Sequence, residues 1–397
     1  MFFRHSFRET VRRATAHCPG WPGLTKQQTR LLLKPSKIQR SLFVCLAALT
    51  SACVLLVPST RAVDDDDDDK DRHQTYTVLV GAEDATVGAG APAFFPDTVT
   101  IHVGDTVHWQ RNTNEIHTVT FLAGTPLPPF NVPAPPDQPS PLMRNPVVIF
   151  PTVPANGQYD GTTYANAGIF GPDPDIFQGV ESFDLTFTQP GTYPYLCLVH
   201  GVRMSGEIIV VDHHVHVPSP GAVAAEAKRS IEEALEDALG LFGLADAEVP
   251  APTQNDDGTT TFYVLVGFSA GESDVVHFFP DELTVHPGDT VEWVFSMEDV
   301  DNHTITFLNG NADIPDLLVV DQGQDPPLLL VNPDFLFPQN PGEPLTEDGV
   351  YSSGRLPQGD PPPSFSLTIG NIIGDEPYKC LYHDASGMTG LLHIVPR

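Results

Sequence analysis

The chain has few cysteines and few basic residues. Its 397 residues include five Cys and 20 Lys and Arg, against 51 Asp and Glu, which gives a formal net charge of −31. Three of the cysteines lie within the first 53 residues, so only Cys197 and Cys380 remain in the body of the chain. Two cysteines cannot form the disulfide framework of a small secreted domain. The acidic surface excludes nucleic acid as a partner, because it would repel phosphate.

Long apolar runs are also scarce. One run covers residues 41–57, with three basic residues shortly before it and small residues after it. This order predicts a secretory signal in residues 1–62; an uncleaved membrane anchor and a lipoprotein site at Cys53 are the alternatives. We therefore expect a periplasmic or extracellular protein whose only membrane contact would be an uncleaved leader. The leader holds ten basic residues and one acidic residue, so the remainder carries a net charge of about −40.

Residues 63–74 follow the leader as an acidic spacer. Six consecutive Asp residues occupy positions 64–69. Like charges repel one another and remain solvated, so a flexible spacer is expected, with binding of divalent cations as the alternative.

The rest of the chain repeats itself after about 185 residues. Val-Leu-Val-Gly at 78–81 recurs at 264–267, and Phe-Phe-Pro-Asp at 94–97 recurs at 278–281. Gly-Asp-Thr-Val at 104–107 recurs at 288–291. This period is too long for a solenoid repeat and indicates duplication of a whole domain. We predict a first domain at 75–217, a helix and linker at 218–258, and a second domain at 259–397.

Each domain is predicted to be all-β. Seven segments of the first are short, alternating and rich in β-branched and aromatic residues: 76–80, 98–103, 106–110, 118–122, 183–187, 192–197 and 206–211. Many short strands at this spacing predict a two-sheet sandwich. The proline-rich stretches 123–182 and 309–364 break the rhythm, and we expect each to wrap one edge of its domain.

A helix is expected between the domains. Ser219 and Pro220 are suited to the N-cap and first helical positions, and Gly240 could end the helix. An apolar residue recurs every four positions, which predicts a stripe that packs on a domain or on the seam between the two. The stripe consists of Val223, Ala227, Ile231, Leu235 and Leu239. Residues 250–258 would then be the linker.

Both remaining cysteines belong to one repeated motif. Each begins a Cys-x-x-His sequence followed by Met, and each is preceded by a lone His in a strand pattern. The candidate metal ligands are His117, Cys197, His200 and Met204 in the first domain, and His303, Cys380, His383 and Met388 in the second. One thiolate, two imidazoles and a weak axial thioether are the ligand set of a blue copper electron-transfer site. A Cys197–Cys380 disulfide and two inert buried thiols are the alternatives.

These motifs resemble the plastocyanin/azurin family of cupredoxins. The resemblance covers most of each domain: the Phe-x-Pro and Gly-Asp-Thr-Val-x-Trp strands, the lone His, and the Cys-x-x-His…Met-x-Gly terminus. It implies two tandem Greek-key β-sandwich (cupredoxin-like) domains, each with a type 1 copper ion cycling between Cu(I) and Cu(II). It also implies a carrier and not an enzyme, passing electrons through the edge of His200 or His383 to redox protein partners outside the cytoplasm. The negative charge could steer a basic partner, or reflect a saline habitat.

The two motifs differ in ways that bear on function. Three residues separate His200 from Met204, whereas four separate His383 from Met388. We therefore expect two different reduction potentials. Arg203 lies near one set and Asp384 near the other, which predicts that the first centre is the stronger oxidant.

Two other functions remain open. A two-domain copper oxidoreductase would need histidines for a type 2 site, and the one His-x-His pair is His214–His216, beside His213. A polar strand end before the predicted helix is the favoured explanation of these three residues. A copper storage or buffering protein would use many Cys or Met, whereas this chain has one of each per site.

Overall fold

The computed structural model describes residues 73–171, 180–296, 301–320, 327–356 and 364–397. The expected leader and nearly all of the acidic spacer lie outside the described residues. The chain divides into Met1–Asp64 and Asp65–Arg397, and the described residues all belong to the second unit. No helix within these residues is long and apolar enough to cross a membrane.

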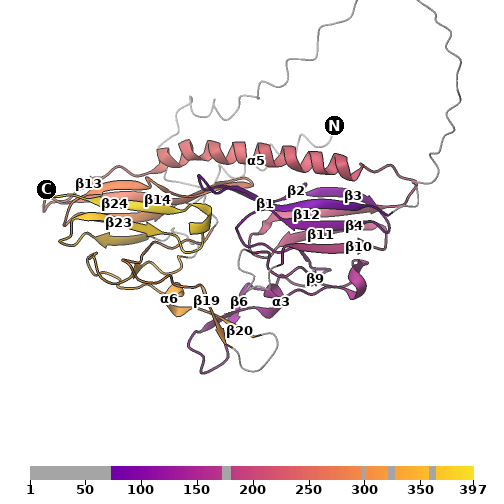
Figure 1. Cartoon of the computed structure of the whole chain (residues 1–397), viewed down its shortest axis with the longest axis horizontal. Helices are drawn as coiled ribbons and strands as arrows, with labels where there is room; N and C mark the ends of the chain where they lie inside the picture. The colour runs from indigo at the N-terminus through magenta and orange to yellow at the C-terminus, as the bar shows by residue number, and fades with distance from the viewer. Residues whose placement is uncertain (1–72, 172–179, 297–300, 321–326, 357–363) are drawn as a thin grey trace, which may run out of the picture. The chain divides into compact units, whose positions relative to one another are not determined.

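The first domain is a sandwich of two sheets (Figure 1). One face is formed, in spatial order, by β2 (Ala89–Phe95), β1 (Thr75–Asp84), β4 (Thr106–Arg111), β10 (Ser182–Phe187) and β8 (Gln158–Tyr159). The other contains β3 (Thr98–His102), β12 (Gly201–Val211), β11 (Gly191–Cys197), β5 (Thr120–Phe121) and β9 (Ala165–Asn166). Alternate residues point into the core around Trp109. The predicted all-β sandwich is confirmed.

The second domain repeats this arrangement. One sheet contains β15 (Ser273–Phe279), β14 (Thr260–Ala270), β17 (Thr290–Phe295) and β22 (Ser364–Thr368), with β13 (Thr253–Gln254) on β14. The other contains β16 (Glu282–Val285), β24 (Thr389–Ile394), β23 (Gly374–Lys379), β18 (Thr306–Phe307) and β21 (Tyr351–Ser352). A separate core surrounds Trp293, so each domain buries its own apolar residues.

One sheet is continuous across both domains. Strands β2 and β15 pair antiparallel, with Gly90 opposite Asp274 and Ala89 opposite Val275. The sequence pattern did not predict β2, because its Gly, Ala and Pro residues lack the alternation of a strand. Pro92 is tolerated there because the β1–β2 register shifts at that point, where a ladder hydrogen bond is missing anyway.

The two proline-rich stretches pair with each other. Strands β6 (Asn131–Pro133), β7 (Leu142–Arg144), β20 (Leu328–Val331) and β19 (Leu317–Val320) form a four-stranded sheet. Arg144 Nη2 lies 2.7 Å from Asp316 Oδ2 across the domain boundary. Short helices α3 (Pro146–Ile149) and α6 (Pro333–Leu336) lie beside this sheet, and η2 (Ala155–Gly157) follows α3 in the chain. We expected each stretch to wrap an edge of its own domain. The structure shows in addition that the two stretches form one sheet together.

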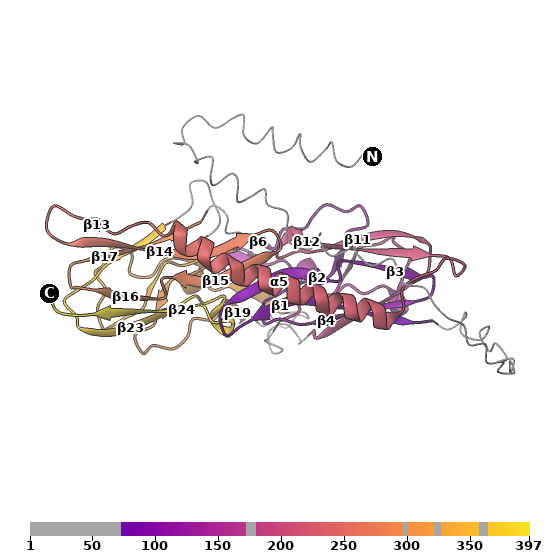
Figure 2. The same cartoon turned by 90° about the horizontal axis from the view of Figure 1, so that it is seen from above.

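Helix α5 (Pro220–Glu248) spans both domains, as Figure 2 shows from above. Ser219 caps it as predicted, but the helix continues past Gly240 and the short strand β13 lies in the expected linker. An α-helix has 3.6 residues per turn, so a stripe of residues spaced four apart winds gradually around the helix. Leu239 is therefore exposed, while Ala238, Leu241 and Ala245 are buried against the second domain. The helix packs on the seam between the domains, which is one of the two predicted alternatives.

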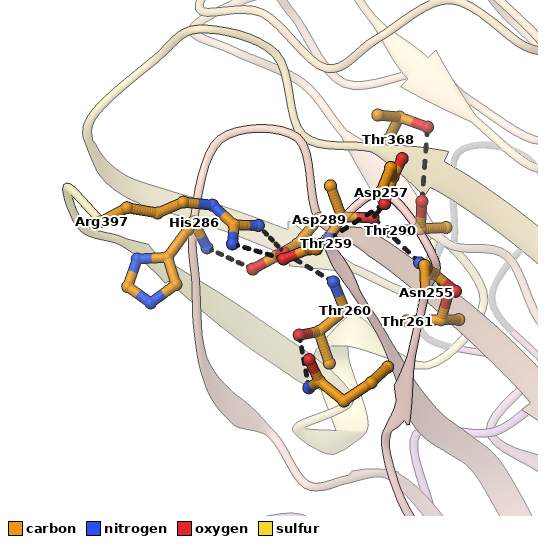
Figure 3. A network of polar contacts seen from close by, with 12 residues as sticks. Asn255, Asp257, Thr259, Thr260, Thr261, His286, Asp289, Thr290, Thr368 and Arg397 are labelled. Carbon is orange, nitrogen blue, oxygen red and sulfur yellow. Dashed lines mark hydrogen bonds and ion pairs between the residues drawn. The ribbon is translucent and has the colours of Figure 1, made fainter.

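The repeated Gly-Asp-Thr motif ties the first strand of each domain to a turn. Buried Asp289 accepts hydrogen bonds from the backbone N–H groups of Thr260 and His286, both at 2.9 Å, and also contacts Arg397 (Figure 3). In the first domain Asp105 accepts from the N–H groups of Gln74 at 2.8 Å and His102 at 2.9 Å. The motif therefore has the same structural role in both domains.

Candidate metal centres

The first candidate centre joins three elements of the first domain. His117 precedes β5, Cys197 ends β11, and His200 lies in the turn before β12. The Nδ1 atoms of the two histidines are 3.2 Å apart. The Cys197 Sγ atom lies 3.9 Å from His117 Nδ1 and 3.6 Å from His200 Nδ1. His117 and Cys197 are fully buried.

The second domain brings the equivalent residues together in the same way. The Nδ1 atoms of His303 and His383 are 3.1 Å apart. Cys380 Sγ lies 3.7 Å from His303 Nδ1 and 3.6 Å from His383 Nδ1. Cys197 and Cys380 are both free and buried, so the alternative of a disulfide between them is wrong.

Both triangles of donor atoms fit one metal ion. In the first centre, the point equidistant from the three donor atoms lies about 2.1 Å from each of them. In the second centre this distance is about 2.0 Å. Bonds from a first-row metal such as zinc are ~2.0–2.1 Å to imidazole nitrogen and ~2.3 Å to thiolate. Two imidazoles and a thiolate facing one point are the trigonal part of a blue copper site.

The two predicted axial ligands are also buried. Met204 lies within β12 and shares the core cluster of Cys197, while Met388 directly precedes β24 and shares the cluster of Cys380. Neither methionine is exposed. Their role as axial ligands remains a prediction that fits this placement.

The ligand loops differ as the spacing indicates. In the first domain Gly201 has a φ of 62° and opens β12 directly after His200. In the second, the additional residue forms a 3₁₀ turn, η3 (Asp384–Ser386), which ends at Gly387 with a φ of 93°. The Met388 N–H donates to the His383 carbonyl at 3.0 Å, which closes that longer loop.

A threonine after the first histidine holds each cysteine loop. The Thr118 N–H donates to Cys197 Sγ at 3.3 Å, and the Thr118 hydroxyl accepts from the Leu198 N–H at 2.7 Å. Thr304 repeats both bonds, with Cys380 Sγ at 3.4 Å and the Leu381 N–H at 2.7 Å. These threonines therefore support the ligand arrangement.

The electrostatic environment suits metal binding, which requires neutral imidazole and thiolate. Burial lowers the pKa of His117 to about 3, so its ring is neutral at pH 7. Burial raises the pKa of both thiols, but the adjacent histidines outweigh it. The pKa of Cys197 is therefore lowered, through His200, and that of Cys380 is well below its usual value, through His383 and His303.

The glycine of each Met-x-Gly motif is required by packing. A Cβ atom at Gly206 would lie 2.6 Å from the Tyr195 ring and from the Asp97 carbonyl. A Cβ atom at Gly390 would lie 2.2 Å from the Tyr378 ring. These buried tyrosines precede the ligand cysteines by two residues, so the motif reflects close packing of the ligand strands.

The edges of His200 and His383 face one cavity between the domains. This cavity is about 760 Å³ and is lined by both histidines, Asp301, Tyr382 and Arg355, among others. The His200 side chain is only 9% exposed, and its Nε2 atom is 3.9 Å from Asp301 Oδ1. No sequence motif indicates that the two histidine edges share a cavity or that Asp301 lies beside one of them.

The two charges that motivated the predicted order of potentials are both compensated. Arg203 donates to the carbonyls of Gly271 at 3.0 Å and Ser273 at 2.9 Å and lies 3.9 Å from Asp274. The Asp384 carboxylate is 2.8 Å from Lys379 Nζ. The structure thus weakens the electrostatic reason for making the first centre the stronger oxidant.

The histidines after β12 lie apart from both centres. His213 and His214 are exposed in a turn, and the His213 ring is 5.1 Å from that of His102 and 6.4 Å from that of His73. In the part of the chain that the structure describes, compact groups of potential ligands occur at the two predicted centres alone.

Comparison with known proteins gives a family match and similar solved structures. The family model described as copper binding proteins, plastocyanin/azurin family, matches residues 82–211. Similar solved structures include a Cu(I) methionine-to-alanine mutant of amicyanin, with 19% identity over 34% of this chain and 82% of that chain, at a TM-score of 0.20. Another is oxidised plastocyanin from Dryopteris crassirhizoma, with 21% identity over 34% of this chain and 99% of that chain, at a TM-score of 0.19. Residues 82–211 are therefore similar to the plastocyanin/azurin family of copper-binding proteins.

Proposed function

We propose that the protein is an electron carrier with two type 1 copper centres, one in each domain. This proposal rests on the two nearly equal donor triangles. In each domain, a buried methionine lies in the same core cluster as the ligand cysteine. Thiolate and thioether favour Cu(I), while imidazole suits copper in both oxidation states. Bound copper would supply a one-electron couple between Cu(I) and Cu(II).

The surrounding residues are suited to hold the donors still during such a change. Each thiolate accepts a backbone N–H bond from Thr118 or Thr304, and each cysteine loop is fastened by the hydroxyl of the same threonine. Burial of His117, His303 and both cysteine side chains limits the access of water to the donor triangles. A rigid donor set keeps structural rearrangement small when the charge of the centre changes.

We also propose that the redox partner is a protein outside the cytoplasm that gains access through the inter-domain cavity. The edges of His200 and His383 line this cavity, and the imidazole edge is the outermost part of each donor set. A net charge of about −40 beyond the predicted leader would favour a basic partner. The predicted leader supports the proposal of a periplasmic or extracellular localisation.

Single-cysteine variants test the two-centre proposal. Cys197→Ser and Cys380→Ser should each remove about half of the visible thiolate-to-copper absorption, because each removes one thiolate ligand. If one variant removes all the colour, or either removes none, two independent type 1 centres are excluded.

A redox titration separates this function from copper storage. A carrier should cycle reversibly between a blue oxidised form and a colourless reduced form, whereas a store need not. Copper in excess of two ions per chain would instead favour an oxidoreductase with an additional type 2 site.

A further inference from the structure

Each ligand loop is held by a hairpin of the other domain. Arg203, next to Met204, donates to the Gly271 and Ser273 carbonyls at the β14–β15 turn. In return, the Ser386 hydroxyl, two residues before Met388, donates at 3.0 Å to Glu83 at the end of β1. The internal repeat relates these two contacts, so the loops that carry the predicted axial ligands are both part of the domain interface.

Asp301 brings this interface into contact with a metal ligand. The Nδ1 atom of His200 faces the donor triangle, so Nε2 is the nitrogen that points away from it. That Nε2 atom lies 3.9 Å from Asp301 Oδ1, and both side chains are about nine-tenths buried. Asp301 belongs to the second domain, two residues before its ligand His303. One carboxylate thus connects a ligand of the first centre with the ligand segment of the second.

Glu115 occupies the equivalent position in the first domain. Its Oε2 atom lies 4.0 Å from His117 Nε2, within its own domain. The contact between Asp301 and His200, in contrast, crosses from the second domain to the first. Asp301 is therefore the member of the pair that connects the two domains.

We propose that Asp301 is a positioning residue shared by the two metal centres, orienting the His200 ring from the opposite domain and linking the two reduction potentials. Carboxylates beside the distal nitrogen of a metal-bound histidine fix the ring and make it a stronger donor. At 3.9 Å the contact is longer than a direct hydrogen bond, so the carboxylate acts on the metal-bound ring through its charge. The charge acts in a buried environment, where salt screens it little. It stabilises the oxidised, more positive centre and lowers its potential.

The test uses the full chain with Cys380→Ala, so that the first domain holds the one remaining blue centre. Asp301→Asn in this background should raise the reduction potential of that centre, although the substitution is in the other domain. Asp301→Glu should keep the potential close to that of the parent, because it retains the charge. Asp348→Asn, at an exposed position of the second domain, makes the same change in net charge and should have no effect.

The control outcomes separate this inference from the proposed function on which it rests. Absence of blue colour in the loaded wild-type chain contradicts the proposed function itself. A blue chain whose potential is unchanged by Asp301→Asn contradicts the role of Asp301 alone. If Asp301→Glu shifts the reduction potential as much as Asp301→Asn does, the effect comes from packing and not from charge. That result would also overturn the proposed role of Asp301.

A second measurement needs no substitution at Asp301. If one carboxylate serves both centres, the first centre should have a different potential in the wild-type chain and in the Cys380→Ala chain. Spectroelectrochemical titration of both chains gives this comparison. The same potential in both would mean that the centres are independent, which contradicts the proposal even if Asp301→Asn fails to fold.

Discussion

The two metal centres are alike in their donors and unlike in their loops. The donor atoms form triangles whose corresponding edges differ by no more than 0.2 Å, from 3.2, 3.6 and 3.9 Å to 3.1, 3.6 and 3.7 Å. The chain between the second His and the Met, in contrast, begins a strand in the first domain and forms a 3₁₀ turn in the second. Where the sandwich core holds the ligands, the two domains agree. Where the loops meet the other domain, they differ.

Among the features that the two domains share, the largest effect is expected when the glycine of the Met-x-Gly motif is replaced. Gly206→Ala and Gly390→Ala should each destabilise their domain by about 1–3 kcal/mol, because the new methyl group overlaps a buried tyrosine. Calorimetric unfolding measures this. Gly243→Ala, in helix α5 with no atom near its Cβ position, is the control and should stabilise the chain by up to about 1 kcal/mol. Similar destabilisation by all three would show that the tyrosine contact is not the cause.

An effect of similar size is expected when the threonine beside each centre loses its hydroxyl. Thr118→Val and Thr304→Val leave the buried N–H of Leu198 or Leu381 without its acceptor, which costs about 1–3 kcal/mol. The losses should be equal in the two domains, because both bonds are 2.7 Å long. Paired denaturant titrations compare them. Markedly unequal losses of unfolding free energy would show that the two cysteine loops are not equivalent.

The loops themselves should control the difference between the two potentials. Exchanging residues 201–203 with residues 384–387 should transfer most of the difference in reduction potential from one domain to the other. Arg203→Gln and Asp384→Asn should change it less, because their charges are compensated by Asp274 and Lys379. Redox titration of single-centre chains provides the measurement. If the two charge substitutions abolish the difference, charge and not loop geometry determines it.

The smallest effect concerns the pH dependence of the metal-free protein. The pKa of His117 is about 3 in the folded protein, against an ordinary value of 6.5, so between these values the unfolded chain binds a proton that the folded chain does not. The contribution of His117 to stability is therefore complete above about pH 6.5 and is lost as the pH falls towards 3. His117→Gln should show a shallower decline in unfolding free energy over this range. Identical slopes would contradict the depressed pKa.

Much of the fold and of both donor sets could be predicted from local sequence. The alternating segments and the repeated Gly-Asp-Thr-Val motif indicate strands and a turn, and the Cys-x-x-His spacing brings two donors to one loop. The lone histidines could be identified because the repeat placed each of them at the same position before its cysteine. These features depend on residues close in sequence or on the duplication itself.

The inter-domain features could not be predicted in this way. Strand β2 lacks alternation and is stabilised by pairing on both sides, while β7 and β20 pair although they belong to different domains. Leu239 was assigned to the buried stripe, but the rotation of a four-residue period carries it to the exposed side of α5. Asp301 has no motif of its own, and its importance depends on the opposite domain. Each of these features arises from tertiary contacts between distant segments.

The central claim, that each domain holds one type 1 copper ion, is tested most directly by metal analysis combined with electron paramagnetic resonance of the fully loaded, oxidised chain. We predict two copper ions per chain, both with the small copper hyperfine splitting of thiolate-bound type 1 centres. One copper ion per chain, or a second ion with the large splitting of a centre without thiolate, would contradict the equivalence of the two donor sets.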